Sequence, residues 1–309
     1  MKRINAYITD FLEYLEIDRG RSARTIKNYD FYLKRFSNWA ENPKPDKVNT
    51  DLIHKYRLYL NRLKEGRDDE TLKKSTQNYH LIALRAFLKY LAKHDIKTMS
   101  AEQIELAKQS KRTVAFLETD ELIKLLKQPM LISNGMIAFR DKAILELLFS
   151  TGMRVSELAN LKIDQINLKR DEFTVRGKGD KPRIVFLSKK AKETIKEYVG
   201  KRRDASPYIF FSHDRAKKNR KYSGPLTPRS VQRIVEKYAL TAGITKKITP
   251  HTLRHTFATD LLLSGADIRS VQSMLGHESI TTTQIYTHIT NNQMKEVHKK
   301  FHDKGRNDL

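Results

Sequence analysis

The sequence predicts a mainly α-helical protein with a small antiparallel β-ribbon, divided into a helical first domain and a mixed α/β second domain. Its 309 residues suit about two domains of ordinary size. Apolar residues recur three or four positions apart through the first hundred residues, which is the spacing of amphipathic helices. Short strand-like segments are confined to the second half. We expect domains at 1–95 and 115–309, joined by a linker at 96–114.

Four amphipathic helices account for the first domain. Their apolar positions are Ile4, Ile8, Phe11, Leu12 and Leu15; Tyr29, Leu33, Phe36 and Trp39; Ile53, Tyr56, Leu60 and Leu63; and Leu81, Leu84, Phe87, Leu88 and Leu91. Ser22 and Thr50 are the expected N-caps, because a hydroxyl there can accept a hydrogen bond from the first turn. Polar stretches at 42–45 and 64–70 separate the helices. In the linker, Ser100 and Gln103 favour one short helix.

The second domain is predicted to begin with a helix from Thr119 to Leu126 and a buried helix over 138–149. Three short strands follow at 163–168, 172–175 and 183–187, with a hairpin turn at 177–180. They would form a three-stranded antiparallel ribbon. Thr227 and Thr249 each precede a proline, which is typical of an N-cap followed by proline in the first helical position. The remaining chain is predicted to be helical.

Composition points to a nucleic-acid partner. Lys and Arg total 60 against 36 Asp and Glu, a formal charge of +24. The polar faces of the first domain are rich in such cations, and as a set they could follow a phosphate backbone. Exposed helices are commonly lysine-rich too, so each residue alone is a weak signal. The candidates for DNA contact are Arg24, Lys27, Lys73, Lys74 and Arg85.

Several classes of protein are excluded by the same composition. No apolar run approaches the roughly 18 residues that a membrane span needs. The chain contains no cysteine, which excludes disulfides, thiolate metal sites and a cysteine nucleophile. Its first residues resemble neither a signal peptide nor a transit peptide, so we expect a cytoplasmic, nucleoid-associated protein.

Six residues in the second domain suit chemistry on a phosphodiester without a metal or another cofactor. Arg154 and Arg254 could clamp the nonbridging oxygens, because a guanidinium binds two oxygens at once. Tyr286 is the candidate nucleophile, and His251 and the arginines could supply the base and the cationic surroundings that its hydroxyl needs to attack at neutral pH. Lys178, in the hairpin turn, could protonate the leaving 5′ oxygen, and His277 could donate a further hydrogen bond.

In this order, Arg154, Lys178, His251, Arg254, His277 and Tyr286 resemble the tyrosine recombinase family, and its Xer-type members most. The resemblance extends over nearly the whole chain and implies a SAM-like core-binding domain followed by a catalytic domain. It implies strand exchange through a covalent 3′-phosphotyrosyl intermediate, by four protomers on double-stranded DNA with paired half-sites. The assembly would be a homotetramer, or a heterotetramer with a paralogue. The segment 291–302 would be a helix that docks into a neighbouring subunit.

Simpler interpretations exist for single residues. Arg154 and Glu157 have the spacing of an ordinary ion pair within a helix. His251 and His255 have the spacing of a zinc-binding helix, but Thr252 stands where a metalloprotease needs glutamate, and no third ligand is evident. We therefore predict no metal site. Glu157 itself is interpreted as a buried structural partner.

Resolution of chromosome or plasmid dimers is the leading role, and a mobile-element integrase is close behind. A type IB topoisomerase or a hairpin-telomere resolvase would use similar residues, but the first domain and the length argue against both. A catalytically silent DNA-binding protein would lack the nucleophile or an arginine, and none is missing. The sequence does not decide whether a paralogue or a DNA translocase takes part.

Overall fold

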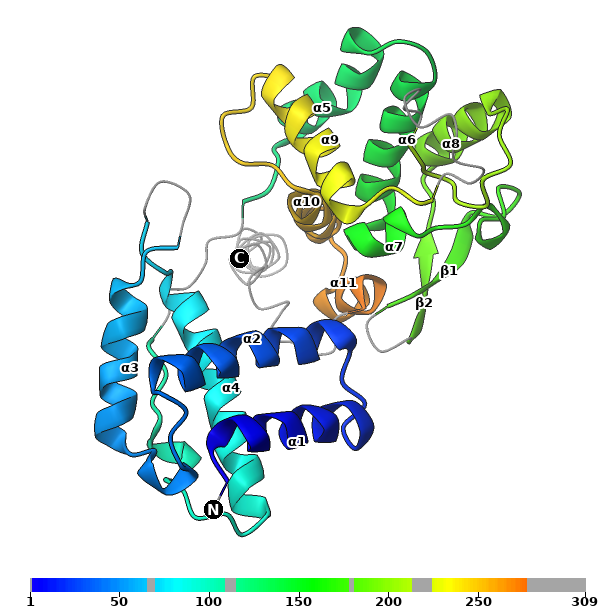
Figure 1. Cartoon of the computed structure of the whole chain (residues 1–309). Coiled ribbons are helices and arrows are strands. Elements are labelled where there is room, and N and C mark those ends of the chain that lie inside the picture. The colour runs from blue at the N-terminus through cyan, green and yellow to red at the C-terminus, as the bar shows by residue number, and fades with distance from the viewer. Residues whose placement is uncertain (1, 66–69, 109–114, 178–180, 213–223, 277–309) are drawn as a thin grey trace, which may run out of the picture. The chain divides into compact units, whose positions relative to one another are not determined.

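A computed structural model describes residues 2–65, 70–108, 115–177, 181–212 and 224–276 of the chain (Figure 1). The chain divides into two compact units, Met1–Lys111 and Arg112–Leu309. The described secondary structure is helical apart from one two-stranded antiparallel sheet and isolated bridges. The predicted fold class is confirmed, and the predicted domain and linker boundaries stay predictions.

The first unit contains the four predicted helices. They are α1 (Ile4–Ile17), α2 (Ala23–Trp39), α3 (Thr50–Arg62) and α4 (Lys74–Lys93), with short 3-10 turns η1 (Pro45–Lys47) and η3 (Ala101–Gln103). Ser22 caps α2 as predicted, accepting a hydrogen bond from the Thr25 amide at 3.3 Å. The cap of α3 is Asn49 and not Thr50, because the side-chain oxygen Oδ1 of Asn49 accepts a hydrogen bond from the Leu52 amide at 2.9 Å.

An aromatic core holds these helices together. Phe11 of α1 lies 5.6 Å from Phe87 of α4, and Phe36 of α2 lies 5.0 Å from Tyr56 of α3, measured between ring centroids. The segment after α4 belongs to the same packing. The side-chain amide of Asn78 exchanges two hydrogen bonds with the backbone of Ala107, at 2.9 and 3.0 Å. Residues 101–104 bury apolar side chains against this core.

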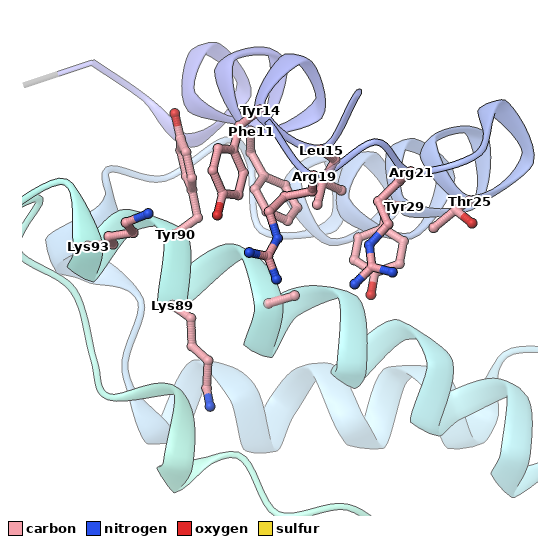
Figure 2. Close-up of a pocket in the computed structure, with 11 residues that line it drawn as sticks. Phe11, Tyr14, Leu15, Arg19, Arg21, Thr25, Tyr29, Lys89, Tyr90 and Lys93 are labelled. Atoms are coloured by element: carbon pink, nitrogen blue, oxygen red, sulfur yellow. The ribbon is translucent and has the colours of Figure 1, made fainter. Parts of the chain in front are cut away.

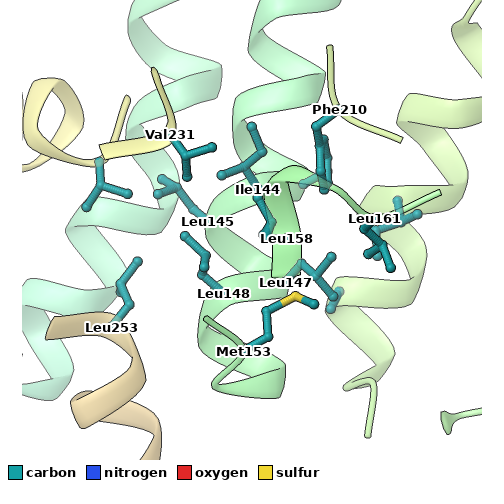
Figure 3. Packing of buried hydrophobic residues seen from close by; sticks show 14 of the residues in the cluster. Ile144, Leu145, Leu147, Leu148, Met153, Leu158, Leu161, Phe210, Val231 and Leu253 are labelled. Atoms are coloured by element: carbon teal, nitrogen blue, oxygen red, sulfur yellow. The ribbon is translucent and has the colours of Figure 1, made fainter. Parts of the chain in front are cut away.

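The second unit is built around one buried helix. Its elements are α5 (Thr119–Ile132), α6 (Gly135–Thr151), α7 (Val155–Ala159), η4 (Ile163–Gln165), β1 (Glu172–Arg176), β2 (Pro182–Phe186), α8 (Lys189–Lys201), α9 (Pro228–Thr241), α10 (Pro250–Leu263) and α11 (Ile268–Leu275). α6 contacts α5, α8, α10, α7, α9 and β2. Figure 3 shows its apolar side chains, such as Leu145 and Leu148, among residues of the surrounding elements, including Val231 of α9 and Leu253 of α10.

The predicted caps of α9 and α10 are confirmed. Thr227 and Thr249 accept hydrogen bonds from Ser230 and Thr252, and a proline occupies the first helical position in each case. α5 starts at Thr119 as predicted but continues past Leu126 to Ile132, with Pro129 inside it. The buried helix predicted over 138–149 is α6, which is a few residues longer at both ends.

The predicted three-stranded ribbon is wrong, since the described residues contain two strands there. β1 and β2 pair in antiparallel register, from Glu172 opposite Phe186 to Arg176 opposite Pro182. The segment 163–168 forms η4 and a turn instead. The Gln165 side chain accepts a hydrogen bond from the Lys162 amide at 3.0 Å, and Asn167 accepts one from the Lys169 amide at 2.9 Å. Such local side-chain bonds compete with strand pairing.

Within the described ranges, no helix is both long and apolar enough to cross a membrane.

Candidate active site

Arg154, His251 and Arg254 are the three predicted active-site residues that the structure describes, and all lie in the second unit. Lys178, His277 and Tyr286 lie outside the described residues, as does the predicted docking segment 291–302. The two arginines converge on the end of α11. Arg154 Nη2 donates to the Gly276 carbonyl at 2.9 Å, and Arg254 Nη2 donates to the Leu275 carbonyl at 2.5 Å.

A sharp turn after α6 places Arg154. Gly152 ends the helix in the left-handed conformation, with φ +57°. A Cβ atom there would overlap the ring of Phe257 on α10, so only glycine fits. The Thr151 hydroxyl bonds to the Leu147 carbonyl at 2.6 Å and accepts from the Met153 amide at 3.3 Å. These contacts fix the turn and leave Arg154 at the start of α7.

Glu157, one turn into α7, holds Arg154. Its carboxylate accepts from the Arg154 backbone amide at 2.8 Å and from Arg154 Nη1 at 2.9 Å. The Glu157 side chain is 5% exposed, whereas that of Arg154 is 31% exposed. The ion pair expected from the spacing is therefore present. Because only the arginine reaches solvent, Arg154 can still meet an anion while Glu157 stays buried.

Arg254 is buried in the middle of the unit. Arg254 is 3% exposed, and its Nη1 donates a hydrogen bond to the Gly152 carbonyl at 2.7 Å. With its bond to Leu275, Arg254 therefore joins the end of α6 to the end of α11. A buried cation is costly unless its donors are satisfied, and here backbone carbonyls at two helix ends satisfy two of them. The arrangement keeps a fixed positive charge beside Arg154.

His251 lies at the start of α10, is exposed, and feels the charges of both arginines. Partial burial, followed by the charges of Arg254 and Arg154, lowers the pKa of His251 below its ordinary value of 6.5. The imidazole is therefore neutral at pH 7 and able to accept a proton. His255 stacks edge-on against it, with ring centroids 4.3 Å apart. In the described part of the chain, no three metal-ligating side chains lie together.

Sequence reasoning missed three positions around Arg154. Arg183 of β2 donates to Glu157 at 2.8 Å through Nη2. Burial lowers the pKa of Arg183, and the nearby charge of Glu157 acts in the opposite direction. Gly177, at the end of β1, approaches so closely that a Cβ there would lie 3.3 Å from Arg154 Nη1. Gly276 has φ +62°, and a Cβ there would lie 2.7 Å from Arg183 Cδ.

The strand pattern could have pointed to Arg183. Side chains alternate between the two faces of a strand. In β2, Arg183 and Val185 share the less exposed face, and Pro182, Ile184 and Phe186 are exposed. A charged residue on the buried face of a strand needs a partner, which is the signal that the sequence offers. The partner itself, Glu157, cannot be identified from that pattern.

The five predicted DNA-contacting residues lie on two helices of the first unit. Arg24 and Lys27 are exposed on α2, Lys73 and Lys74 are exposed at the start of α4, and Arg85 is half-buried on α4. None of the five has an ion-pair partner among the described residues, in contrast to three other cations of these helices. Those paired cations are Lys34 with Asp30, Arg35 with Glu65, and Lys89 with Glu102.

A basic pocket of about 390 Å³ lies where the end of α1 and the start of α2 meet α4. Figure 2 shows Arg19 and Arg21 reaching toward α4, which contributes Lys89, Tyr90 and Lys93. Aromatic side chains form part of the wall, and Lys93 Nζ lies 5.5 Å from the centre of the Tyr14 ring. The basic residues of this pocket thus lie on or next to α2 and α4, the helices that carry the predicted DNA-contacting residues.

Comparison with known proteins decides the family. The model described as "Phage integrase family" matches residues 115–293, and that described as "Phage integrase, N-terminal SAM-like domain" matches residues 8–95. The chain belongs to the phage integrase family. It is a tyrosine recombinase, an enzyme of site-specific recombination, as the resemblance of the sequence predicted.

Xer proteins are among the relatives of this recombinase. It is 37% identical over 319 residues to tyrosine recombinase XerC of Thermodesulfovibrio yellowstonii, covering 100% of both chains. It is 38% identical over 316 residues to tyrosine recombinase XerD of Listeria innocua, covering 98% of this chain and 100% of the relative. The crystal structure of XerH bound to its palindromic difH substrate has the same fold, with a TM-score of 0.71 at 24% identity over 94% of this chain and 84% of that chain.

Proposed function

We propose that this recombinase cuts and rejoins double-stranded DNA through a 3′-phosphotyrosyl intermediate on Tyr286, and that it resolves chromosome or plasmid dimers. One observation carries the chemical part. Arg154 and Arg254 bind the adjacent carbonyls of Gly276 and Leu275, at 2.9 and 2.5 Å. The next residue in the chain is His277, and Tyr286 follows nine positions later. Two phosphate-binding arginines are thus anchored at the start of the segment that holds the nucleophile.

The proposed first step is an exchange of one ester for another. The Tyr286 oxygen attacks the phosphorus, and His251, neutral at pH 7, takes the phenolic proton. The bond to the 5′ oxygen breaks as Lys178 protonates that oxygen. Arg154, Arg254 and His277 donate hydrogen bonds to the nonbridging oxygens, where charge develops. The 5′ hydroxyl of a partner strand then reverses the step, so the bond energy is kept and neither ATP nor a metal is required.

Lys178 receives support from its neighbour in the chain. Gly177 lies against the Arg154 guanidinium, at the end of β1. The Gly177 amide donates to the Lys181 carbonyl at 2.9 Å, which closes the described base of the hairpin. Lys178 directly follows this glycine in the sequence. An acid that directly follows Gly177, a residue lying beside Arg154, suits protonation of a leaving group on the same phosphate.

DNA is the proposed partner of both units. The charge of +24, and the cations of α2 and α4 that have no ion-pair partner among the described residues, favour a phosphate backbone. The structurally similar XerH was crystallised on its difH substrate. We further propose four protomers on two paired half-sites, as a homotetramer or with a paralogue. The nearly equal identity to a XerC and a XerD supports dimer resolution as the role, with a DNA translocase as a candidate partner.

The test is to capture covalent protein–DNA adducts. Fragmented genomic DNA of the source organism is incubated with the protein or with Tyr286→Phe and denatured, and the DNA ends linked to protein are sequenced. We expect junctions shared by many fragments, attached through a 3′ phosphate and absent with the variant. A single chromosomal locus would support dimer resolution, and the ends of a mobile element would support integration. Site-selective binding without any adduct, even on a nicked site, would contradict the recombinase mechanism.

A further inference from the structure

Arg183 is a buried cation to which the proposed mechanism gives no task. Its side chain is 9% exposed, although it lies on β2, whose neighbouring residues face solvent. Nη2 donates to Glu157 Oε2 at 2.8 Å. Nε and Nη1 are buried as well and have no hydrogen-bond partner among the described residues. Burying unsatisfied donors of a charged group costs stability, so a purely structural role explains this arginine poorly.

Arg183 contacts two residues that also bind Arg154. Both guanidinium groups bind the same carboxylate, because Glu157 Oε1 accepts from Arg154 Nη1 and Oε2 accepts from Arg183 Nη2. The stem of Arg183 packs so tightly against Gly276 that a Cβ there would lie 2.7 Å from Cδ. The carbonyl of that same glycine is the second acceptor for Arg154. Arg183 therefore contacts both Glu157 and Gly276, the two residues that accept hydrogen bonds from the Arg154 guanidinium.

The charges of this cluster do not cancel. Arg154 and Arg183 share one carboxylate, so the three side chains carry a net charge of about +1. With Glu157 divided between two cations, Arg154 is only partly neutralised, and it is the one that reaches solvent. In a site from which water is partly removed, that remaining positive charge attracts an anion strongly.

We propose that Arg183 is a positioning residue for Arg154: it shares the Glu157 carboxylate and packs against Gly276, and so keeps the Arg154 guanidinium only partly neutralised and aimed at the scissile phosphate. This inference rests on the proposed phosphotyrosyl mechanism. It assigns Arg183 no contact with DNA. Its effect is on the charge that builds on the nonbridging oxygens, and that effect distinguishes it from a residue that only stabilises the fold.

The experiment compares two substrates. The duplex carries the cleavage site defined by adduct mapping, with either a normal phosphate or a methylphosphonate at the scissile position. A methylphosphonate has a methyl group in place of one nonbridging oxygen, so its transition state carries one negative charge less. Single-turnover adduct formation is measured for the full-length protein and for Arg183→Met, Arg183→Lys and Arg154→Ala. DNA affinity and thermal unfolding are measured on the same preparations.

We expect Arg183→Met to slow adduct formation by about 100-fold on the phosphate, as a misplaced reacting group does, with unchanged DNA affinity. The methylphosphonate should remove most of this defect, as it should for Arg154→Ala. Arg183→Lys, which keeps the charge, should recover part of the rate on the phosphate. The matched control is Arg140→Met, which removes a similarly buried arginine paired with Asp141 on α6 and should retain the wild-type rate.

Two results would overturn the proposal while leaving the mechanism intact. One is a wild-type rate for Arg183→Met on the phosphate. The other is a slow rate that is equally slow on the methylphosphonate, which would mean that Arg183 only stabilises the fold. If the wild-type protein itself forms no adduct on either substrate, the phosphotyrosyl mechanism fails and the role of Arg183 fails with it.

Discussion

The two units of this recombinase use their polar residues in opposite ways. The described core of the first unit is aromatic and aliphatic, with Ser37, Asn78 and His80 as its buried polar residues, and its cations are mostly exposed. The second unit buries charged side chains among its core helices, including Arg140, Asp141, Glu146 and Arg254. Exposed cations suit attraction of DNA, whereas buried and hydrogen-bonded cations are fixed in place before the substrate arrives.

This difference leads us to expect that binding and chemistry respond to different substitutions. Changes on the surface of the first unit should alter the affinity for DNA and leave the rate of adduct formation in the bound complex unchanged. Changes at Arg154, Glu157 or Arg183 of the second unit should alter the rate of adduct formation and leave the affinity for DNA unchanged. The predictions below test that separation.

The largest effect is expected for Arg154→Ala. Removing one of the two arginines that we propose bind the phosphate should slow single-turnover adduct formation by about 1,000-fold, because charge on the nonbridging oxygens loses a preorganised donor. The dissociation constant for DNA should stay within about twofold, since many other cations contribute to binding. Gel-shift titration and denaturing-gel kinetics measure the two quantities. A parallel loss of affinity and rate would mean that the units do not divide these tasks.

A core substitution in the first unit should change stability instead. Phe87 is fully buried and packs on Phe11 at 5.6 Å. Phe87→Ala should lower the free energy of unfolding by about 4 kcal/mol, through lost burial and the cavity that remains. Denaturant titration followed by circular dichroism measures it. Tyr79→Ala is the control on the same helix, because Tyr79 is 54% exposed and should change stability by about 0.5 kcal/mol or less.

The pH dependence of the chemical step should report on His251. In the proposed mechanism the neutral imidazole accepts the proton, so adduct formation should fall as the pH drops through the lowered pKa of His251, below 6.5. The positive charges of Arg254 and Arg154 contribute to that lowering. Arg154→Met should therefore move the acidic limb toward higher pH, and His251→Gln should abolish it. An acidic limb unchanged in His251→Gln would assign the base to another group.

The smallest effect is expected for a single surface cation. Lys74 lies at the start of α4 and has no ion-pair partner among the described residues, whereas Lys34 is paired with Asp30 at 2.9 Å. Lys74→Ala should weaken DNA binding by about tenfold or less and reduce the slope of log affinity against log salt by about 1. Lys34→Ala is the matched control and should change the slope less. Equal slopes for the two variants would remove Lys74 from the DNA contacts.

Local patterns predicted much of the fold because single elements are governed by local chemistry. The apolar spacing around Phe11, Phe36 and Phe87 defined the helices, and Thr249 before Pro250 defined the start of α10. The predicted strand at 163–168 was wrong because alternation of Ile166 and Leu168 with polar residues describes a strand and a turn equally well. The side-chain hydrogen bonds of Gln165 and Asn167 to nearby backbone amides stabilise the turn.

The sequence predicted which residue types form the site, but it did not predict the hydrogen bonds and packing contacts between them. Arg154, His251 and Arg254 came from their motifs, and the structure brings them together at the ends of α6 and α11. The need for glycine at 152 depends on Phe257, more than a hundred residues away. Sharing of Glu157 with Arg183 likewise depends on the approach of β2, which no local pattern encodes.

The most direct test of the account is to identify the residue that becomes linked to DNA. The adduct formed by the full-length protein is digested with protease and nuclease, and the modified peptide is sequenced by mass spectrometry. We predict a nucleotide joined through its 3′ phosphate to Tyr286, with no adduct from Tyr286→Phe. A nucleotide on any other side chain, or an undiminished adduct in the variant, would contradict the account.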